Sequence, residues 1–459
     1  MVISIGVFLI AVALAADWLG IGSDPEFGPS QIVLTIVGCI VLFIGLALRL
    51  QVARQLVRLS LSLKIPMVLG GLLAGLLMSE FGLRFTERKV HNQIDNGVKN
   101  EFQGLLQPIP DPRLGVRLAP YAGGHDANGF RNDTVPAQVD IVAIGDSQTW
   151  GINAKRHEAW PQMLAKLYNR TVYNMGLGYY EPVQYWVLTE EALMLSPKVI
   201  IIGLYFGNDL WDAYRLVWGS ETYVSFRNKA GVDILSDTIG PRVKVLIDEE
   251  SAESQFKRPT SSKLSVWLSG HSAIIRLLKR CGWLSDAAGR LKYEKAKAWA
   301  LVHPDHGAVY TKGRISTVFT TAYRLLALNL NEPRIAEGLR LTKKMLILTK
   351  AKTDKSGVRL LILMIPTKEL VYAEAMRELK GYLDETYTEL VEMETRSRNE
   401  IVSFCDENGI KYVDTMLLLQ KAIKKNEQIY PSDTDGHFMP RGYFLLASAT
   451  FDELVRLGW

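Results

Sequence analysis

The chain has 459 residues, 48% of them hydrophobic, and a formal net charge of +5 at pH 7. This length favours two or three structural units. So small a charge, without a long run of Lys and Arg, argues against nucleic acid as a partner. The three cysteines, Cys39, Cys281 and Cys405, lie far apart, and no HExxH motif occurs. These patterns exclude a disulfide scaffold and CxxC-type zinc or redox sites, so we expect no metal and no cofactor.

Three apolar stretches near the N-terminus predict transmembrane helices. They cover about residues 2–19, 32–48 and 65–81, and each approaches the ~20 residues that a helix needs to cross a bilayer. A signal peptide explains the first stretch poorly, because no basic segment precedes it and two more stretches follow. The first connection is acidic and the second holds four basic residues, so the positive-inside rule puts the second connection in the cytoplasm.

This topology predicts how the whole chain is organised. Residues 1–85 are expected to form three transmembrane helices in a bacterial inner membrane, with everything after about Arg84 on the periplasmic side. Residues 86–138 are polar and rich in Pro and Gly, which is typical of a linker and a loop that leads into a domain. Residues 139–459 are expected to form that domain.

From residue 139 onward, short apolar segments alternate with segments of helical periodicity. In chain order we expect strand 139–144, helix 159–168, strand 172–175, helix 182–195 and strand 199–205. Continuous apolar strands that alternate with helices indicate a parallel sheet covered on both faces. The sequence therefore predicts an α/β domain.

The regular pattern breaks after residue 212. Residues 213–323 mix charged, Ser-rich and aromatic stretches, and we interpret them as an insertion that serves as a lid or a partner surface. Regular elements are expected to return with helix 333–352, strand 359–365, helix 373–408, strand 411–413 and helix 441–457.

Polar residues follow the predicted strands at the edge where ligands bind to open parallel sheets. Ser147 comes just after the first strand, Gly178 and Tyr179 follow the second, and Asn208 follows the third. A serine hydroxyl is a weak nucleophile that needs a neighbouring base, and His437, ahead of the last helix, could supply it. The Ser147 N–H, a glycine N–H and the Asn208 amide could bind a tetrahedral oxyanion. This combination is suited to acyl transfer.

Four short blocks in this order resemble the conserved blocks of the SGNH (GDSL-like) hydrolases. They are Gly145-Asp146-Ser147, Asn174 to Gly178, Gly207-Asn208-Asp209 and Asp435-Gly436-His437. The resemblance covers the chain from about Asp140 to the C-terminus, apart from the insertion. It implies a flavodoxin-like fold, Ser147 as the nucleophile and His437 as the base. It also implies an oxyanion hole made by the Ser147 backbone, a glycine of the second block and Asn208.

The sequence departs from the family pattern in two of these blocks. The common Asp-x-x-His spacing would put the acid at Thr434. The resemblance then implies Asp435, in an Asp-x-His arrangement that is similar to periplasmic polysaccharide O-acetyltransferases, with Asp433 as the alternative. A plain helix-start role for Asp435 also stays open. In the second block the expected glycine position is Tyr179, so Gly178 and Tyr179 both remain candidate donors.

Two charged residues are candidate substrate contacts. Lys368 follows the strand at 359–365 and could contact a polymer or a carboxylate, although a solvated loop charge explains it equally well. Arg131 lies in a predicted tight turn at residues 128–132, ahead of the first strand, and could assist at the site. Asp146 is expected to brace the turn that carries the serine.

Three functions remain open at this point. The first is a membrane-anchored serine esterase that acts on O-acetyl or similar groups of extracytoplasmic glycans. The second is an O-acyltransferase of a cell-envelope polysaccharide that works beside a multi-pass membrane acyl donor protein. The third is a catalytically silent subunit of a membrane complex, against which the intact Ser147, Asn208 and His437 argue. The expected partners are therefore an acylated glycan and membrane lipid.

Overall fold

The computed structural model describes residues 39, 107–178, 180–228 and 285–459. The chain divides into two compact units, Met1–Asp95 with Lys257–Ala288 and Asn96–Phe256 with Gly289–Trp459. Nearly all the described residues belong to the second unit. The three predicted transmembrane stretches lie outside the described residues, apart from Cys39. Among the helices that the structure describes, none combines the length and the apolar character that crossing a bilayer requires.

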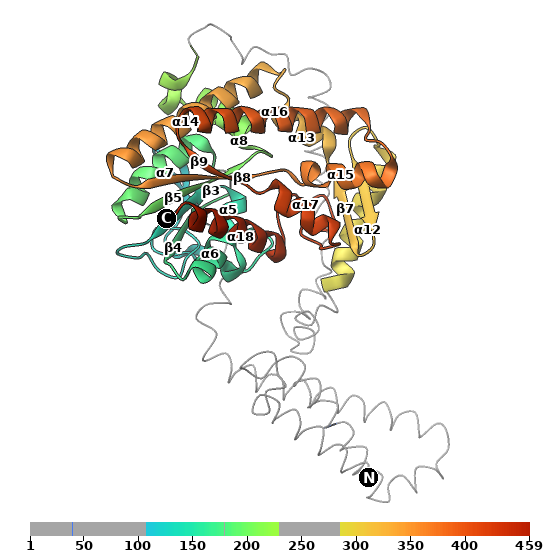
Figure 1. The fold of residues 1–459 in the computed structure, drawn as a ribbon, viewed down its shortest axis with the longest axis horizontal. Helices are drawn as coiled ribbons and strands as arrows, with labels where there is room; N and C mark the ends of the chain where they lie inside the picture. Colours follow the sequence, from blue (N-terminus) through green and yellow to red (C-terminus); the bar gives the residue numbers. More distant parts are fainter. Residues whose placement is uncertain (1–38, 40–106, 179, 229–284) are drawn as a thin grey trace, which may run out of the picture. The chain divides into compact units, whose positions relative to one another are not determined.

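A five-stranded parallel sheet forms the centre of the second unit (Figure 1). Its strand order is β4-β3-β5-β8-β9. The strands are β3 (Ile141–Gly145), β4 (Val172–Gly176), β5 (Val199–Tyr205), β8 (Arg359–Ile365) and β9 (Lys411–Asp414). This is the doubly wound order of flavodoxin-like folds. The predicted parallel-sheet α/β domain is confirmed.

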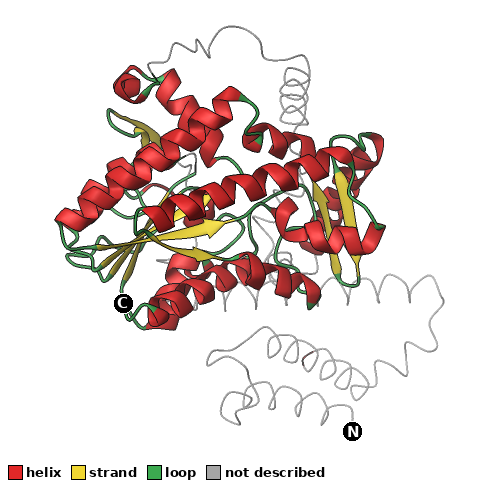
Figure 2. Ribbon diagram, turned by 45° about the horizontal axis from the view of Figure 1, so that its top comes forward, coloured by secondary structure: helices red, strands yellow, loops and turns green. Residues whose placement is uncertain are grey.

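Helices cover both faces of this sheet, as Figures 1 and 2 show. One face carries α7 (Pro182–Met194), α8 (Asp209–Gly219), α14 (Pro333–Lys355) and α16 (Glu385–Glu407). The other carries α5 (Ser147–Trp150), α6 (Trp160–Tyr168), α17 (Met416–Lys424) and α18 (Pro440–Arg456). Because both faces are covered, the central strands are mostly apolar, and every residue of β5 is buried.

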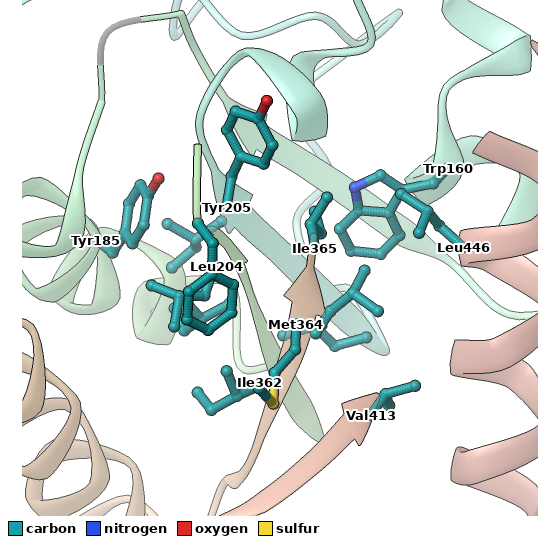
Figure 3. Packing of buried hydrophobic residues seen from close by; sticks show 14 of the residues in the cluster. Trp160, Tyr185, Leu204, Tyr205, Ile362, Met364, Ile365, Val413 and Leu446 are labelled. Carbon is teal, nitrogen blue, oxygen red and sulfur yellow. The ribbon is translucent and has the colours of Figure 1, made fainter. Parts of the chain in front are cut away.

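The core side chains alternate between the two faces of the sheet. Figure 3 shows Ile362 and Met364 of β8 on one side, whereas Ile365 lies near Trp160 and Leu446 on the other. All five side chains are buried. Such a strand is a short, continuous apolar run in the sequence, which explains why its predicted bounds are those observed.

The region predicted as a linker and an insertion contains further regular structure. Residues 107–138 include the hairpin of β1 (Pro108–Asp111) and β2 (Gly115–Leu118) and the 3-10 helix η1 (Ala122–Gly124). α8 continues past residue 212 to Gly219. Later elements are η3 (Glu221–Phe226), α12 (Ser285–Val302), the hairpin of β6 (Ala308–Lys312) and β7 (Ile315–Phe319), and α13 (Thr321–Leu328). The 3-10 helix η2 (Arg156–Glu158) precedes α6.

The prediction of a single long helix at residues 373–408 is wrong. The structure has two helices there, α15 (Lys368–Lys380) and α16 (Glu385–Glu407). Gly381 ends α15 in a left-handed conformation, with φ of 80°, which glycine adopts without a steric penalty. Asp384 then caps α16 by accepting the N–H of Tyr387 at 2.8 Å. Because the sequence is polar throughout this region, the pattern did not indicate the end of α15 and the start of α16.

The strand order also fixes where a ligand can bind. The chain leaves β3 for β4 on one side and later places β5 on the other side of β3. In a doubly wound sheet the loops that follow two such strands diverge, and the crevice between them is the usual ligand site. The loop after β3 carries Ser147, and the loop after β5 carries Asn208.

Candidate active site

Ser147 is positioned by a short helix that lies close above the sheet. Gly145 at the end of β3 is in register with Gly176 of β4 and Gly203 of β5. A Cβ atom on any of these three glycines would lie within 2.8 Å of the Thr149 side chain. The row of glycines therefore lets α5 approach the strand ends, with Ser147 as its first residue.

Asp146 braces the same turn. It is the N-cap of α5, and its Oδ1 accepts the N–H of Gln148 at 2.9 Å. Its Oδ2 lies 3.4 Å from Ser147 Oγ. Burial raises the pKa of Asp146 to about 6, and the Gln148 N–H and His437 partly oppose that rise. These contacts match the bracing role expected from the sequence.

Ser147, His437 and Asp435 lie in one hydrogen-bonded line. Ser147 Oγ is 2.8 Å from His437 Nε2, and His437 Nδ1 is 2.7 Å from Asp435 Oδ1. With its proton on Nδ1, His437 donates to Asp435 and accepts from Ser147. This is the geometry in which an imidazole can remove a proton from a serine hydroxyl.

Asp435, rather than Asp433, contacts His437. Its Oδ1 also accepts the His437 backbone N–H at 2.9 Å, and its Oδ2 accepts Nδ2 of Asn153 at 2.9 Å. Burial alone would raise the pKa of Asp435, but hydrogen bonds from His437 and Asn153 outweigh it and hold that pKa well below its usual value. Asp433 Oδ1 instead accepts the N–H of Asp435 at 3.1 Å. Asp435 is therefore the anion placed to hold the imidazole.

The predicted oxyanion donors differ in how the structure places them. Gly178 faces the serine, because a Cβ atom added to it would lie 3.9 Å from Ser147 Cβ. Tyr179 lies outside the described residues. Asn208 directly precedes α8, and its Nδ2 donates to Asp212 Oδ2 at 2.6 Å. One amide N–H of Asn208 is thus held by its own helix, which fixes the plane of the amide.

Arg131 is not placed to contact a substrate, so that prediction is wrong. The residue is only 1% exposed. Its guanidinium donates to the carbonyls of Trp150, Gly151 and Ala154 at 2.8–3.0 Å and lies 4.0 Å from the Trp150 ring centroid. Arg131 therefore holds the loop that follows α5, and this loop carries Asn153.

Lys368 is likewise no substrate contact, and it is no solvated charge either. Its side chain is fully buried at the start of α15. Its Nζ donates to the carbonyls of Val318, Asp433 and Asp435 at 2.8–3.0 Å. The ammonium therefore contacts the backbone of the loop that carries the triad acid.

Three further residues that connect the site were not found from the sequence. Asn153 contacts Asp435, and Gln148 Nε2 donates to the carbonyl of Gly436 at 3.1 Å. Arg324 of α13 donates from Nη1 to the carbonyl of Gly207 at 3.0 Å. Gln148 could have been suspected from its place beside Ser147. Arg324 had no signal, because its helix, Thr321–Leu328, was not predicted and begins inside the segment interpreted as an insertion.

Arg324 connects the loop that carries Asn208 to the loop that carries His437. Its guanidinium lies 5.8 Å from the Tyr205 ring and 5.5 Å from the Tyr323 ring. A Cβ atom on Gly436 would lie 2.8 Å from Arg324 Nη2. Arg324 therefore reaches the residues that immediately precede Asn208 and His437. In the described part of the chain, no group of three or more His, Cys, Asp or Glu side chains is arranged to hold a metal ion.

Comparisons with known proteins give distant similarities to solved structures. No protein-family model matches the sequence, and a search of curated proteins finds no match. One similar solved structure is a protein assigned to the G-D-S-L family of lipolytic proteins from Desulfitobacterium hafniense DCB-2, with 12% identity and a TM-score of 0.32 over 69% of this chain and 99% of that one. Another is a catalytic mutant of an acetylxylan esterase from Geobacillus stearothermophilus, with 12% identity and a TM-score of 0.29 over 70% of this chain and 95% of that one. At these scores, the support for a function comes from the geometry of the site.

Proposed function

We propose that this chain is a serine esterase that cleaves acyl esters with Ser147 as nucleophile, His437 as base and Asp435 as the acid that orients it. The observation that carries this proposal is the line of hydrogen bonds at 2.8 and 2.7 Å through these three residues. It lies at the switch point of the sheet, where a substrate can reach the serine.

The reaction follows from the protons that these residues can hold. Ser147 Oγ attacks the ester carbonyl while His437 Nε2 takes the hydroxyl proton, and the tetrahedral oxyanion forms against the N–H groups of Ser147 and Gly178 and the amide of Asn208. His437 returns the proton to the departing alcohol, which leaves an acyl-serine. A water molecule then gives its proton to His437 and attacks the acyl carbon, and the carboxylic acid leaves as Ser147 regains its proton.

The substrate that we propose is an O-acetyl or similar ester on a glycan outside the cytoplasm. The apolar N-terminal stretches and the basic second connection support a membrane-anchored chain with this domain on the outer side. That location favours esters of envelope glycans over those of metabolites as substrates.

An O-acyltransferase is the second candidate, in which a sugar hydroxyl replaces water in the last step. The contact between Asp435 and His437 supports this candidate, because the triad acid lies two residues before the histidine. This is the spacing through which the sequence resembles periplasmic O-acetyltransferases. Such an enzyme would receive its acyl group from a membrane donor protein.

Hydrolysis of a chromogenic acetyl ester, with and without a glycan acceptor, tests both candidates. We expect the wild-type protein to release acetate and the Ser147→Ala variant to lose at least about 10³-fold in turnover. Acetate alone in the presence of acceptor supports the esterase, whereas an acetylated glycan supports the transferase. Equal turnover by wild type and Ser147→Ala would contradict the proposed chemistry.

A further inference from the structure

A buried lysine holds the loop of the triad acid from behind. Lys368 is the first residue of α15, and its side chain is fully buried. Its Nζ lies 2.8 Å from the carbonyl oxygen of Val318 in β7 and 3.0 Å from those of Asp433 and Asp435. A lysine ammonium has three N–H donors, so all three are used on backbone carbonyls.

This placement is costly for a lysine. Burial disfavours its charge, and the start of a helix is the end that repels cations. Burial is the main reason that the pKa of Lys368 is lowered to about 8; Arg324 adds to that effect, while Glu369, Asp433 and Asp435 oppose it. The three hydrogen bonds to backbone carbonyls offset part of this cost.

The same loop is attached to the β6–β7 hairpin by side chains. Ser316 N–H donates to Gln428 Oε1 at 3.1 Å, and Gln428 Nε2 donates back to the Ser316 carbonyl at 3.0 Å. Thr317 Oγ1 donates to the Pro431 carbonyl at 2.9 Å. The segment from 428 to 435 therefore lies along β7, and Lys368 makes the last attachment, at the triad acid itself.

We propose that Lys368 is a positioning residue for the triad: it fixes the backbone of Asp435 so that its carboxylate meets His437. This inference rests on the proposed function. Asp435 is then held at both ends, by Lys368 at its carbonyl and by Asn153 and His437 at its carboxylate. Because a displacement of about 1 Å at a catalytic group can cost about 10²-fold in rate, loss of Lys368 should lower turnover without removing any group that touches the substrate.

The protonation state of Lys368 gives the proposal a second consequence. A neutral amine has two N–H donors, so one of the three carbonyls loses its donor when Lys368 deprotonates. The charged groups that face it are Glu369 on its own helix, Asp433 and Asp435 on the loop, and Arg324 on α13. Turnover should therefore fall as the pH rises above about 8, where a serine–histidine pair alone would stay fully active.

Variants of this lysine test the proposal. Lys368→Met removes the donors, Lys368→Arg keeps a charged donor, and Lys424→Met, on the exposed side of α17, is the matched control. For Lys368→Met we expect kcat to fall roughly 10- to 100-fold, with KM nearly unchanged. Lys368→Arg should recover part of the loss, and Lys424→Met should match the wild type. Retention of wild-type kcat by folded Lys368→Met, or a wild-type kcat that stays constant between pH 7 and pH 10, would overturn the proposal.

An NMR measurement separates failure of this proposal from failure of the proposed function. The proton shared by His437 Nδ1 and Asp435 gives a strongly deshielded signal that requires no substrate. At a fixed pH of about 6.5 we expect this signal in the wild type and in Ser147→Ala, and we expect it to be weaker in Lys368→Met and partly restored in Lys368→Arg. A wild-type protein that shows the signal but hydrolyses no ester, together with loss of the signal in Lys368→Met, would support the role of Lys368 and contradict the esterase. An unchanged signal in folded Lys368→Met would contradict the role of Lys368.

Discussion

The two halves of the triad are held in different ways. Ser147 sits on the sheet itself, because Gly145, Gly176 and Gly203 let α5 rest on three neighbouring strand ends. Asp435 and His437 lie on an irregular loop far along the chain, and side-chain bonds from other elements hold that loop. Backbone register places the nucleophile, whereas scattered side chains place the base and the acid.

This difference predicts where each half is fragile. A change on the serine side has to disturb close packing against the sheet. A change on the histidine side needs only to remove one hydrogen-bond donor, such as the Nδ2 of Asn153. The first kind of change should therefore affect both folding and activity, and the second mainly activity.

The largest effect is expected from the acid itself. Asp435→Asn should lower kcat by about 10³–10⁴-fold, because the amide cannot stabilise the imidazolium and favours the wrong tautomer of His437. Asp433→Asn is the matched control and should lose less than about 10-fold, since the Asp433 carboxylate accepts a backbone N–H of the loop and does not contact His437. Steady-state kinetics on an acetyl ester would measure both. The reverse order of effects would make Asp433 the acid.

The second-largest effect is expected from a change in the packing of α5, which carries Ser147. In Gly145→Ala the new Cβ atom would lie 2.1 Å from Thr149 Oγ1, so α5 has to move. We expect kcat to fall about 10²-fold and the free energy of unfolding to fall by about 1–3 kcal/mol. Gly219→Ala is the control, because nothing lies within 4 Å of the position its Cβ would take. Wild-type activity in Gly145→Ala would show that the glycine row does not position Ser147.

A smaller effect is expected from Asn153, which has a left-handed backbone with φ of 66°. Asn153→Gly removes the side chain without straining that backbone. We expect kcat to fall about 3- to 10-fold with little change in stability, because one charge-assisted hydrogen bond to Asp435 is lost. The free energy of unfolding, from chemical denaturation, would be compared with kcat. A loss of stability that matches the loss of activity would assign Asn153 a purely structural role.

The smallest effect on activity is expected from Glu181, a buried carboxyl group that caps α7. Burial raises the pKa of Glu181 to about 8. Because the folded pKa lies above the unfolded one, this group's contribution to stability is full below about pH 4.5 and is lost as the pH rises through 8. We therefore expect the free energy of unfolding of Glu181→Gln, relative to the wild type, to be roughly 1–4 kcal/mol higher at pH 8.5 than at pH 4. Its turnover should stay within 2-fold of the wild type. Chemical denaturation of both proteins at both pH values would measure this change. A stability difference between variant and wild type that is the same at pH 4 and pH 8.5 would contradict the prediction.

The sequence was sufficient for the features that depend on local pattern. β8 was predicted with its observed bounds, because it is apolar on both faces and short. Ser147 and Asn208 were placed at strand ends from the strand pattern alone, and the strand order then brings those ends together at the switch point. These features follow from periodicity and topology.

The sequence was insufficient for residues whose role depends on burial or on contacts with distant parts of the chain. Lys368 and Arg131 were candidate substrate contacts, with a solvated loop charge as the alternative for Lys368, yet both are buried against carbonyl groups. The sequence does not reveal such burial, because charged residues are seldom fully buried. The choice between Asp433 and Asp435 depends on the path of a loop, which spacing does not determine. Arg324 and the β6–β7 hairpin lie beyond the break in periodicity, so their contacts with the site could not be inferred.

Labelling with a serine-reactive fluorophosphonate, read by intact mass, shows whether Ser147 is an activated nucleophile. We expect one adduct on the wild-type protein, located at Ser147 by peptide mapping, and much slower labelling of His437→Ala, which lacks the base. We expect no adduct on Ser147→Ala. An unlabelled but folded wild type, or equal labelling of Ser147→Ala, would contradict the assignment of Ser147 as the nucleophile.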